Sequence, residues 1–443
     1  MTLATEAADK DSPQRSEQGL VRGIGRWDLV ALIINNVIGA GIFGLPAALY
    51  VLAGTYSLLA FIACAIVIGI VALCFAEMST RFTETGGPYL YARKTLGPLV
   101  GFEVGWLNWI ARLTGFAGVC NLFLIYLALF IPGANEGALR VALIVAVVGL
   151  YTTINLIGIR EMTIVSNIFA VSKLIPLVLF ITIGLFFIDS SRFSFAEPPD
   201  YQPFSKAVLL LVFAFSFEAS MIPAGEVRNP ARDYPRALLI SLSIVAVVYV
   251  LVQVVSIGTL PGLGASERPL ADAAAVFLGS PGAYLITIGA LISTSGTLNA
   301  SILFTSRVPF ALAEQGQLPS VLARIHPRFR TPHVAILLSA SAILLLTIFN
   351  TFITAATISA MVRLSLYIIT AICLILLRRR SDQPVPAFQA PGGLFIPVLV
   401  IALSLWLLSN SSAREARDAG LAALVGLVLY GLTKLRSSTP RPE

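Results

Sequence analysis

Long apolar runs recur along this chain and alternate with short polar segments. Twelve runs reach or approach the roughly 20 residues that a helix needs to cross the hydrocarbon core of a bilayer. They cover residues 28–52, 55–80, 98–131, 137–157, 162–188, 206–226, 237–260, 282–312, 333–350, 353–377, 394–409 and 417–435. The runs are apolar all round and lack the alternation of barrel strands. This pattern predicts an all-α polytopic membrane protein with twelve transmembrane helices.

The amino-acid composition also indicates a membrane protein. Of its 443 residues, 57% are hydrophobic and only 12% are charged, whereas a soluble domain carries about 25% charged residues. We therefore expect three parts: a cytosolic tail over 1–26, a transmembrane domain over 27–435 and a cytosolic tail over 436–443.

Lysine and arginine are distributed unequally between alternate loops, which orients the chain. One set of loops, together with both tails, holds most of these residues. The opposite loops hold Arg140, Arg192, Lys206, Arg268, Arg414 and Arg417. We expect a multi-pass protein of the cytoplasmic (inner) cell membrane with both termini in the cytoplasm. The net charge of +7 follows from this topology and does not indicate nucleic-acid binding. The basic cluster at 378–380 is placed to anchor to lipid headgroups.

The cysteines and histidines form no pattern that indicates a cofactor. The four cysteines, Cys64, Cys74, Cys120 and Cys373, all lie inside apolar runs and form no CxxC pair. The two histidines, His326 and His333, share one loop without neighbouring metal ligands. We expect no metal, no cofactor and no catalytic residues, which argues against an intramembrane enzyme. A channel is disfavoured because no selectivity-filter repeat or ring of like charge is evident.

The first apolar run contains "NNVIGAGIFGLP", in which Gly39, Gly41, Gly44 and Pro46 fall within eight positions. Glycine costs a helix interior about 1 kcal/mol and proline about 3 kcal/mol. Backbone at membrane depth abandons helical pairing only where it is enclosed by protein or lines a cavity. The stretch therefore predicts a helix broken in mid-membrane, with a second half that restarts after Gly41. The alternative is a glycine seam for close helix packing.

A broken helix of this kind offers a site for an anion. Glycine lets a ligand approach the main chain closely, and the restarting half-helix points its unpaired N–H groups and positive dipole end at the gap. A carboxylate suits such a site.

The sixth run reads "LLLVFAFSFEASMIPAGEVRNPARDYP" and contains Ser216, Glu218, Ser220 and Pro223. An acidic residue at membrane depth costs free energy, so Glu218 is a candidate functional residue. The two interrupted runs are the first and the sixth. This spacing is what an inverted repeat of five helices, each half opening with a broken helix, would give.

Four motifs in order resemble those of the amino acid–polyamine–organocation (APC) permease superfamily. They are "IGAGIFGLP" in the first run, "GGPYLYARKTLGPLVGFEVGWLNW" (86–109), "EVRNPARDYPRA" (226–237) and "SRVPFALAEQGQLP" (306–319). The resemblance implies a bacterial amino acid transporter with the leucine-transporter fold. Repeat one would cover about 28–188 and repeat two about 204–380, with two extra helices over about 394–435.

The resemblance also implies a substrate site. In the family, the carboxylate of an amino acid binds amides that match Gly39, Ala40 and Gly41. Its ammonium group binds carbonyls that match Ile38 and Phe215 or its neighbours. Asn299 is a pocket candidate that could equally join two helices. The candidate substrate-binding residues are Ile38, Gly39, Ala40, Gly41, Ile42, Arg112, Phe116, Phe215, Ser216, Phe217 and Asn299.

Among the charged residues within apolar runs, four are candidates for a role in transport: Lys173, Arg112, Arg363 and Glu218. The resemblance suggests that Lys173 takes the place of the sodium ion of sodium-coupled relatives, which makes it the candidate proton-coupling residue. Snorkelling to an interface is the alternative. Either arginine could pair with Glu218 as an internal gate, or receive a second carboxylate on the substrate. Glu218 could be a gate or a proton carrier.

These features predict a secondary active transporter of amino acids, coupled to protons and working by alternating access. An amino acid or amine exchanger is the main alternative. A transporter-like nutrient sensor is a third, although the tails are short for a signalling domain. The expected partners are a small amino acid, protons and membrane lipid. The oligomeric state stays open.

Overall fold

The computed structural model describes residues 23–82, 84, 86–157, 162–222, 224–380 and 386–437. Apart from one isolated bridge between Ile24 and Val227, the regular elements of these residues are helices. The α-helices are α1 (Arg26–Val37), α2 (Ala40–Ala53), α3 (Ser57–Arg81), α4 (Gly87–Leu96), α5 (Pro98–Leu127), α6 (Gly137–Ile157), α7 (Met162–Gly184), α8 (Tyr201–Ala214), α9 (Pro230–Thr259), α10 (Pro269–Glu314), α11 (His333–Phe349), α12 (Phe352–Arg379), α13 (Phe395–Ser409) and α14 (Ala413–Ser437).

Each predicted apolar run coincides with a helix or with a pair of half-helices. Eight helical stretches of the described residues are long and apolar enough to cross a membrane. Shorter apolar helices cover Lys173–Phe187, His333–Phe349 and Phe395–Ser409. Large apolar side chains stand on the outer surface, and Phe186 is 87% exposed. The all-helical, multi-pass membrane architecture is therefore confirmed.

Two elements were not expected from the apolar runs. The short helix α4 has a polar composition and begins with a proline in its first turn, where a missing N–H costs nothing. Helix α10 starts well before the predicted run at 282 and bends at Gly279, whose φ of 64° is one that glycine adopts without strain. The predicted N-terminal tail lies outside the described residues up to residue 22.

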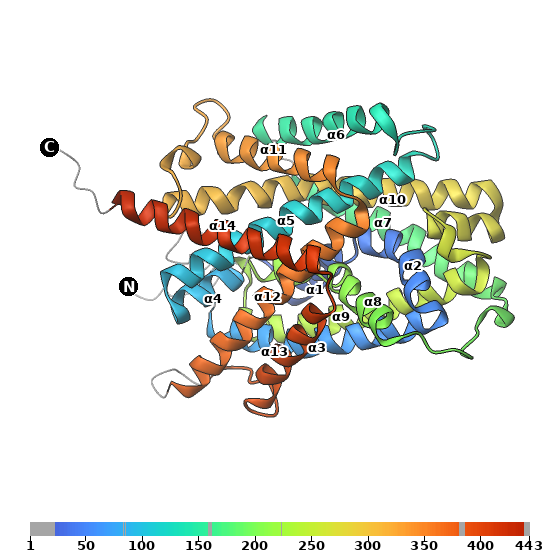
Figure 1. Ribbon diagram of the computed structural model, residues 1–443, viewed down its shortest axis with the longest axis horizontal. Helices are drawn as coiled ribbons and strands as arrows, with labels where there is room; N and C mark the ends of the chain where they lie inside the picture. The colour runs from blue at the N-terminus through green and yellow to red at the C-terminus, as the bar shows by residue number, and fades with distance from the viewer. Residues whose placement is uncertain are drawn as a thin grey trace, which may run out of the picture.

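The helices pack in two groups (Figure 1). One group, here called the scaffold, contains α5, α6, α10 and α11, and in it α5 packs along both α10 and α11. The other, here called the bundle, contains α1, α2, α3, α8 and α9, and in it α9 packs against both α1 and α3. Helix α12 contacts α5 of the scaffold and α8 of the bundle. Helix α12 is therefore one link between the two groups, beside the direct contacts of α10 with α2 and α9.

Candidate functional site

The first broken helix interrupts its hydrogen bonding at Ile38 and Gly39. Helix α1 ends at Val37, Gly39 is non-helical at φ −138° and ψ −139°, and α2 begins at Ala40. The predicted break is confirmed, although the second half restarts at Ala40 and not after Gly41. The first amides of α2 have no intrahelical partner, as at any helix N-terminus. They donate no other backbone hydrogen bond among the described residues.

The sixth predicted run is broken as well. Helix α8 ends at Ala214, and residues 215–217 follow without regular structure. A short 3₁₀ helix, η4 (Glu218–Met221), continues the chain, followed by η5 (Ala224–Glu226). Pro223 lies outside the described residues. The carbonyl groups that end α8 are thereby released at membrane depth.

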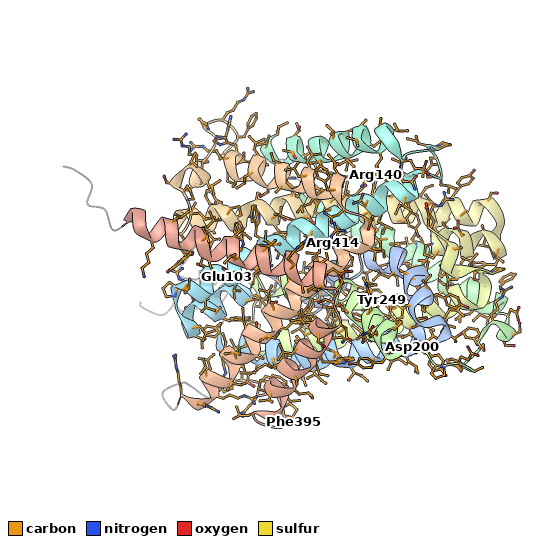
Figure 2. The ribbon with its side chains drawn as sticks, viewed as in Figure 1. Glu103, Arg140, Asp200, Tyr249, Phe395 and Arg414 are labelled. Atoms are coloured by element: carbon orange, nitrogen blue, oxygen red, sulfur yellow. The ribbon has the colours of Figure 1, made fainter. Side chains whose placement is uncertain are left out.

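The two breaks lie against each other in the middle of the bundle. A Cβ atom built on Gly41 would lie 2.6 Å from the Cβ atom of Ala214. The Tyr249 hydroxyl is 2.9 Å from the Val37 carbonyl oxygen and 3.1 Å from the Ala214 carbonyl oxygen. Figure 2 labels Tyr249 near the centre of the molecule. One side chain thus reaches the last carbonyl of α1 and the last carbonyl of α8.

Lys173 reaches the first break from α7. Its side chain is 4% exposed, and its Nζ donates to the carbonyl oxygens of Asn35 at 2.5 Å and Ile38 at 2.7 Å. These carbonyls belong to the last turn of α1, where no helical N–H follows to pair with them. A cation is also favoured at a helix C-terminus by the helix dipole. Lys173 therefore binds the break itself and does not snorkel.

An ion pair joins α12 to the second break. Arg363 pairs with Glu218, the first residue of η4, and the Tyr367 hydroxyl lies 3.2 Å from the other oxygen of that carboxylate. The Nε of Arg363 also donates to Ser359 Oγ at 3.3 Å. Of the two arginines that the sequence offered as partners of Glu218, Arg363 is the one that makes the contact.

Arg112 lies at the middle of α5 and has no such partner. Its Nε is buried without a hydrogen bond, and no carboxylate of the described residues is within ion-pair distance of it. Phe116, four residues further along the same face of α5, is 1% exposed.

The remaining candidates divide between the breaks and the packed interior. The Phe215 ring packs against Tyr249 with centroids 5.0 Å apart, and the Phe217 ring stacks on Tyr367. These two residues therefore present backbone, and not rings, to the break. Ile42 is buried in the first turn of α2. The Oδ1 atom of Asn299 accepts from the Asn155 side chain on α6, so Asn299 joins two scaffold helices. Ser216 is partly buried within the second break.

Two residues near the first break were missed from the sequence. Thr297 on α10 has its Oγ1 3.8 Å from the position of a Cβ on Gly39. Asn36 donates to Ser220 Oγ at 3.2 Å, which connects α1 to η4. Tyr249 is a third residue that was missed. It lies one helical turn before Gln253 in an apolar run, and two side chains with polar groups on one face of such a run are a detectable sign of a buried contact.

A cleft of about 630 Å³ opens beside α2, the second half of the first broken helix. Its lining includes Gly44, Arg140, Glu267 and Phe352. Phe352 lies across Gly44, where a built Cβ would be 2.5 Å from its ring, and it also packs edge-on against Phe213 of α8. Phe352 therefore contacts both broken helices within about one turn of their breaks.

Comparisons with known proteins identify the family. The amino acid permease family profile matches residues 24–416. The serine/threonine exchanger SteT of Bacillus subtilis is 31% identical over 437 residues, which cover 95% of this chain and 99% of that protein. The branched-chain amino acid permease BcaP of the same species is 28% identical, with 95% of each chain covered. The mouse large neutral amino acids transporter small subunit 2 is 28% identical over 93% of this chain and 81% of its own. This chain therefore belongs to the amino acid permease family of the APC superfamily, whose members are transporters and not enzymes.

Proposed function

We propose that this protein is a secondary active transporter that carries amino acids across the cytoplasmic membrane. The observation that carries the proposal is the meeting of two broken helices, with the free amides of α2 beside the released carbonyls of α1 and α8. Amide donors suit a carboxylate and carbonyl acceptors suit an ammonium group. A zwitterionic amino acid carries both groups a few ångströms apart.

In this proposal the substrate binds mainly through the main chain. Its carboxylate accepts from the amides of Gly39, Ala40, Gly41 and Ile42 at the positive end of α2. Its ammonium group donates to carbonyls of Ile38 and of the Phe215–Phe217 segment. The Ile38 carbonyl oxygen already accepts from Lys173, but a carbonyl has two lone pairs. The substrate ammonium and Lys173 then share one acceptor.

This shared acceptor supplies a coupling mechanism. When Lys173 is protonated, it holds the last turn of α1 through Asn35 and Ile38. When it loses its proton, that turn loses two charge-assisted hydrogen bonds, and α1 is free to move. Proton release from Lys173 and substrate release at Ile38 would thus be linked, which makes the transporter a proton-coupled symporter.

The proposed transport cycle is alternating access. The chain would cross the membrane twelve times, as five-plus-five inverted repeats and two extra helices, with both termini in the cytoplasm. The bundle would rock against the scaffold around the two breaks. Arg363 and Glu218 would act as a gate in this motion, because their ion pair joins α12 to the second break.

An exchanger is the second candidate, since SteT, which is 31% identical to this chain, is named as a serine/threonine exchanger. Purified protein in vesicles separates the two. A symporter accumulates labelled amino acid in empty vesicles when the outside is acidified. An exchanger takes up label only when the vesicles contain unlabelled amino acid. Failure of both assays with all common amino acids would contradict the proposed function.

Lys173→Ala tests the coupling residue. We expect this variant to lose uptake driven by a proton gradient, at normal expression and folding. Lys206→Ala is the matched control, because Lys206 on α8 has no ion pair among the described residues. Full gradient-driven uptake by the Lys173 variant would remove this residue from the mechanism.

A further inference from the structure

Arg112 is a membrane-depth cation that forms no ion pair with the described residues. It lies halfway along the 30-residue helix α5. Of the other two cations near the breaks, Arg363 pairs with Glu218 and Lys173 donates to two carbonyl groups. Arg112 receives neither kind of compensation among the described residues. A guanidinium remains charged in proteins, so this charge has to be balanced by something else.

Arg112 also lies beside the second break. Gly115, three residues further along α5, shares a face of the helix with Arg112. A Cβ built on Gly115 would be 3.9 Å from Nη2 of Arg363. The Ser359 hydroxyl, which accepts from Arg363, donates to the Ala111 carbonyl at 2.9 Å. The neighbours of Arg112 on α5 therefore contact the arginine that holds Glu218.

The charge around the breaks is positive as a whole. Glu218 is the carboxylate that pairs with Arg363 there, Lys173 and Arg112 add two further cations, and the N-terminus of α2 adds a partial positive charge. Glu103, the acidic residue of α5, lies against Gly426 of α14 and about 13 Å along the helix from Arg112. A buried charge without a counter-ion is expensive. A zwitterion carries no net charge and would not offset this excess.

We infer that the transported substrate is an amino acid with an anionic side chain, whose carboxylate pairs with Arg112. This inference rests on the proposed function and deepens it. The α-carboxylate of the substrate already binds the amides of α2, so the guanidinium group of Arg112 is left to bind a second carboxylate. Arg112 is therefore the residue that selects among amino acids. Uncharged isosteres, such as glutamine for glutamate, lack the group that it pairs with.

The test uses wild-type protein in vesicles preloaded with an unlabelled mixture of amino acids, so that both a symporter and an exchanger take up label. Labelled glutamate and aspartate are compared with glutamine and asparagine. We expect uptake efficiency at least tenfold higher for the acidic member of each pair. In Arg112→Gln, the acidic preference should disappear while some uptake of a neutral amino acid remains. Arg324→Gln should match the wild type, because Arg324 lies exposed in a loop.

The outcomes separate this inference from the proposed function. Uptake of neutral amino acids with no acidic preference in the wild type overturns the inference alone and leaves an amino acid transporter. An acidic preference that persists in Arg112→Gln assigns the selection to another group and also overturns it. No uptake of any amino acid overturns the proposed function and the inference together. The wild-type comparison decides the matter even if the variant does not fold.

Discussion

Gly41 has no side chain at the point where the two broken helices touch. Because a built Cβ would overlap both the Cβ and the Cα of Ala214, neither helix can give way without moving its backbone. Gly41→Ala should therefore push the breaks apart and cost about 1–3 kcal/mol of stability. We expect amino acid uptake to fall at least tenfold and the melting temperature of the purified protein to drop.

Gly149→Ala on α6 is the control for that substitution. Gly149 also lies within an apolar helix, but no heavy atom lies within 4 Å of its built Cβ. Alanine there should leave uptake unchanged and the fold equally or slightly more stable, since alanine is the better helix former. If Gly41→Ala behaved like Gly149→Ala, the close contact between the breaks would have no functional role.

Tyr249 makes the polar connection at the same contact. Tyr249→Phe keeps the buried ring and removes only the hydroxyl that lies near the Val37 and Ala214 carbonyls. The lost hydrogen bonding should cost about 0.5–1.5 kcal/mol, measured by thermal or denaturant unfolding. Tyr50→Phe, in a tyrosine without a hydrogen bond among those described, should cost less. Equal losses in the two variants would show that the hydroxyl of Tyr249 contributes nothing specific.

At the scale of elements, Phe352 at the start of α12 lines the cleft and contacts both broken helices. It packs on Gly44 of α2 and Phe213 of α8. Phe352→Ala should open this contact, so that a cysteine placed at Ala40 reacts faster with a membrane-impermeant thiol reagent added on the cleft side. The native cysteines are all buried, which keeps the background low. Phe186→Ala, in an 87% exposed side chain, should leave the rate unchanged. An equal rate in the Phe352 variant would mean that another element closes the cleft.

The elements could be predicted from the sequence where one residue type dictates the backbone. Gly39, Gly41 and Pro46 in an apolar run indicate a break. Lipid requires the run to be helical, whereas glycine and proline disfavour a helix. The contact of Gly41 with Ala214 could not be predicted, because it depends on how α2 and α8 cross. The choice of Arg363 over Arg112 as partner of Glu218 was open for the same reason. Both arginines lie near the middle of their helices, and only the packing of those helices decides which one reaches the acid.

At the scale of the whole molecule, the ion pair between Arg363 and Glu218 connects the bundle to α12, which also packs on the scaffold. Glu218→Gln removes the anion and leaves the buried Arg363 without a counter-ion among the described residues. Breaking one side of a buried pair costs about 3–5 kcal/mol. The single variant should therefore unfold well below the wild type in a thermal melt.

The double variant Glu218→Gln with Arg363→Met distinguishes a gate from a purely structural pair. Removing both charges should restore most of the stability, because replacing a buried ion pair by uncharged groups of similar size is often neutral or stabilising. If the pair controls how the bundle moves against α12, transport should remain impaired in this stable protein. A double variant that is stable and transports normally would reduce the pair to a structural contact. The contacts of Lys173 with the end of α1 would then be the next to test, since they join the first break to α7 without involving α12.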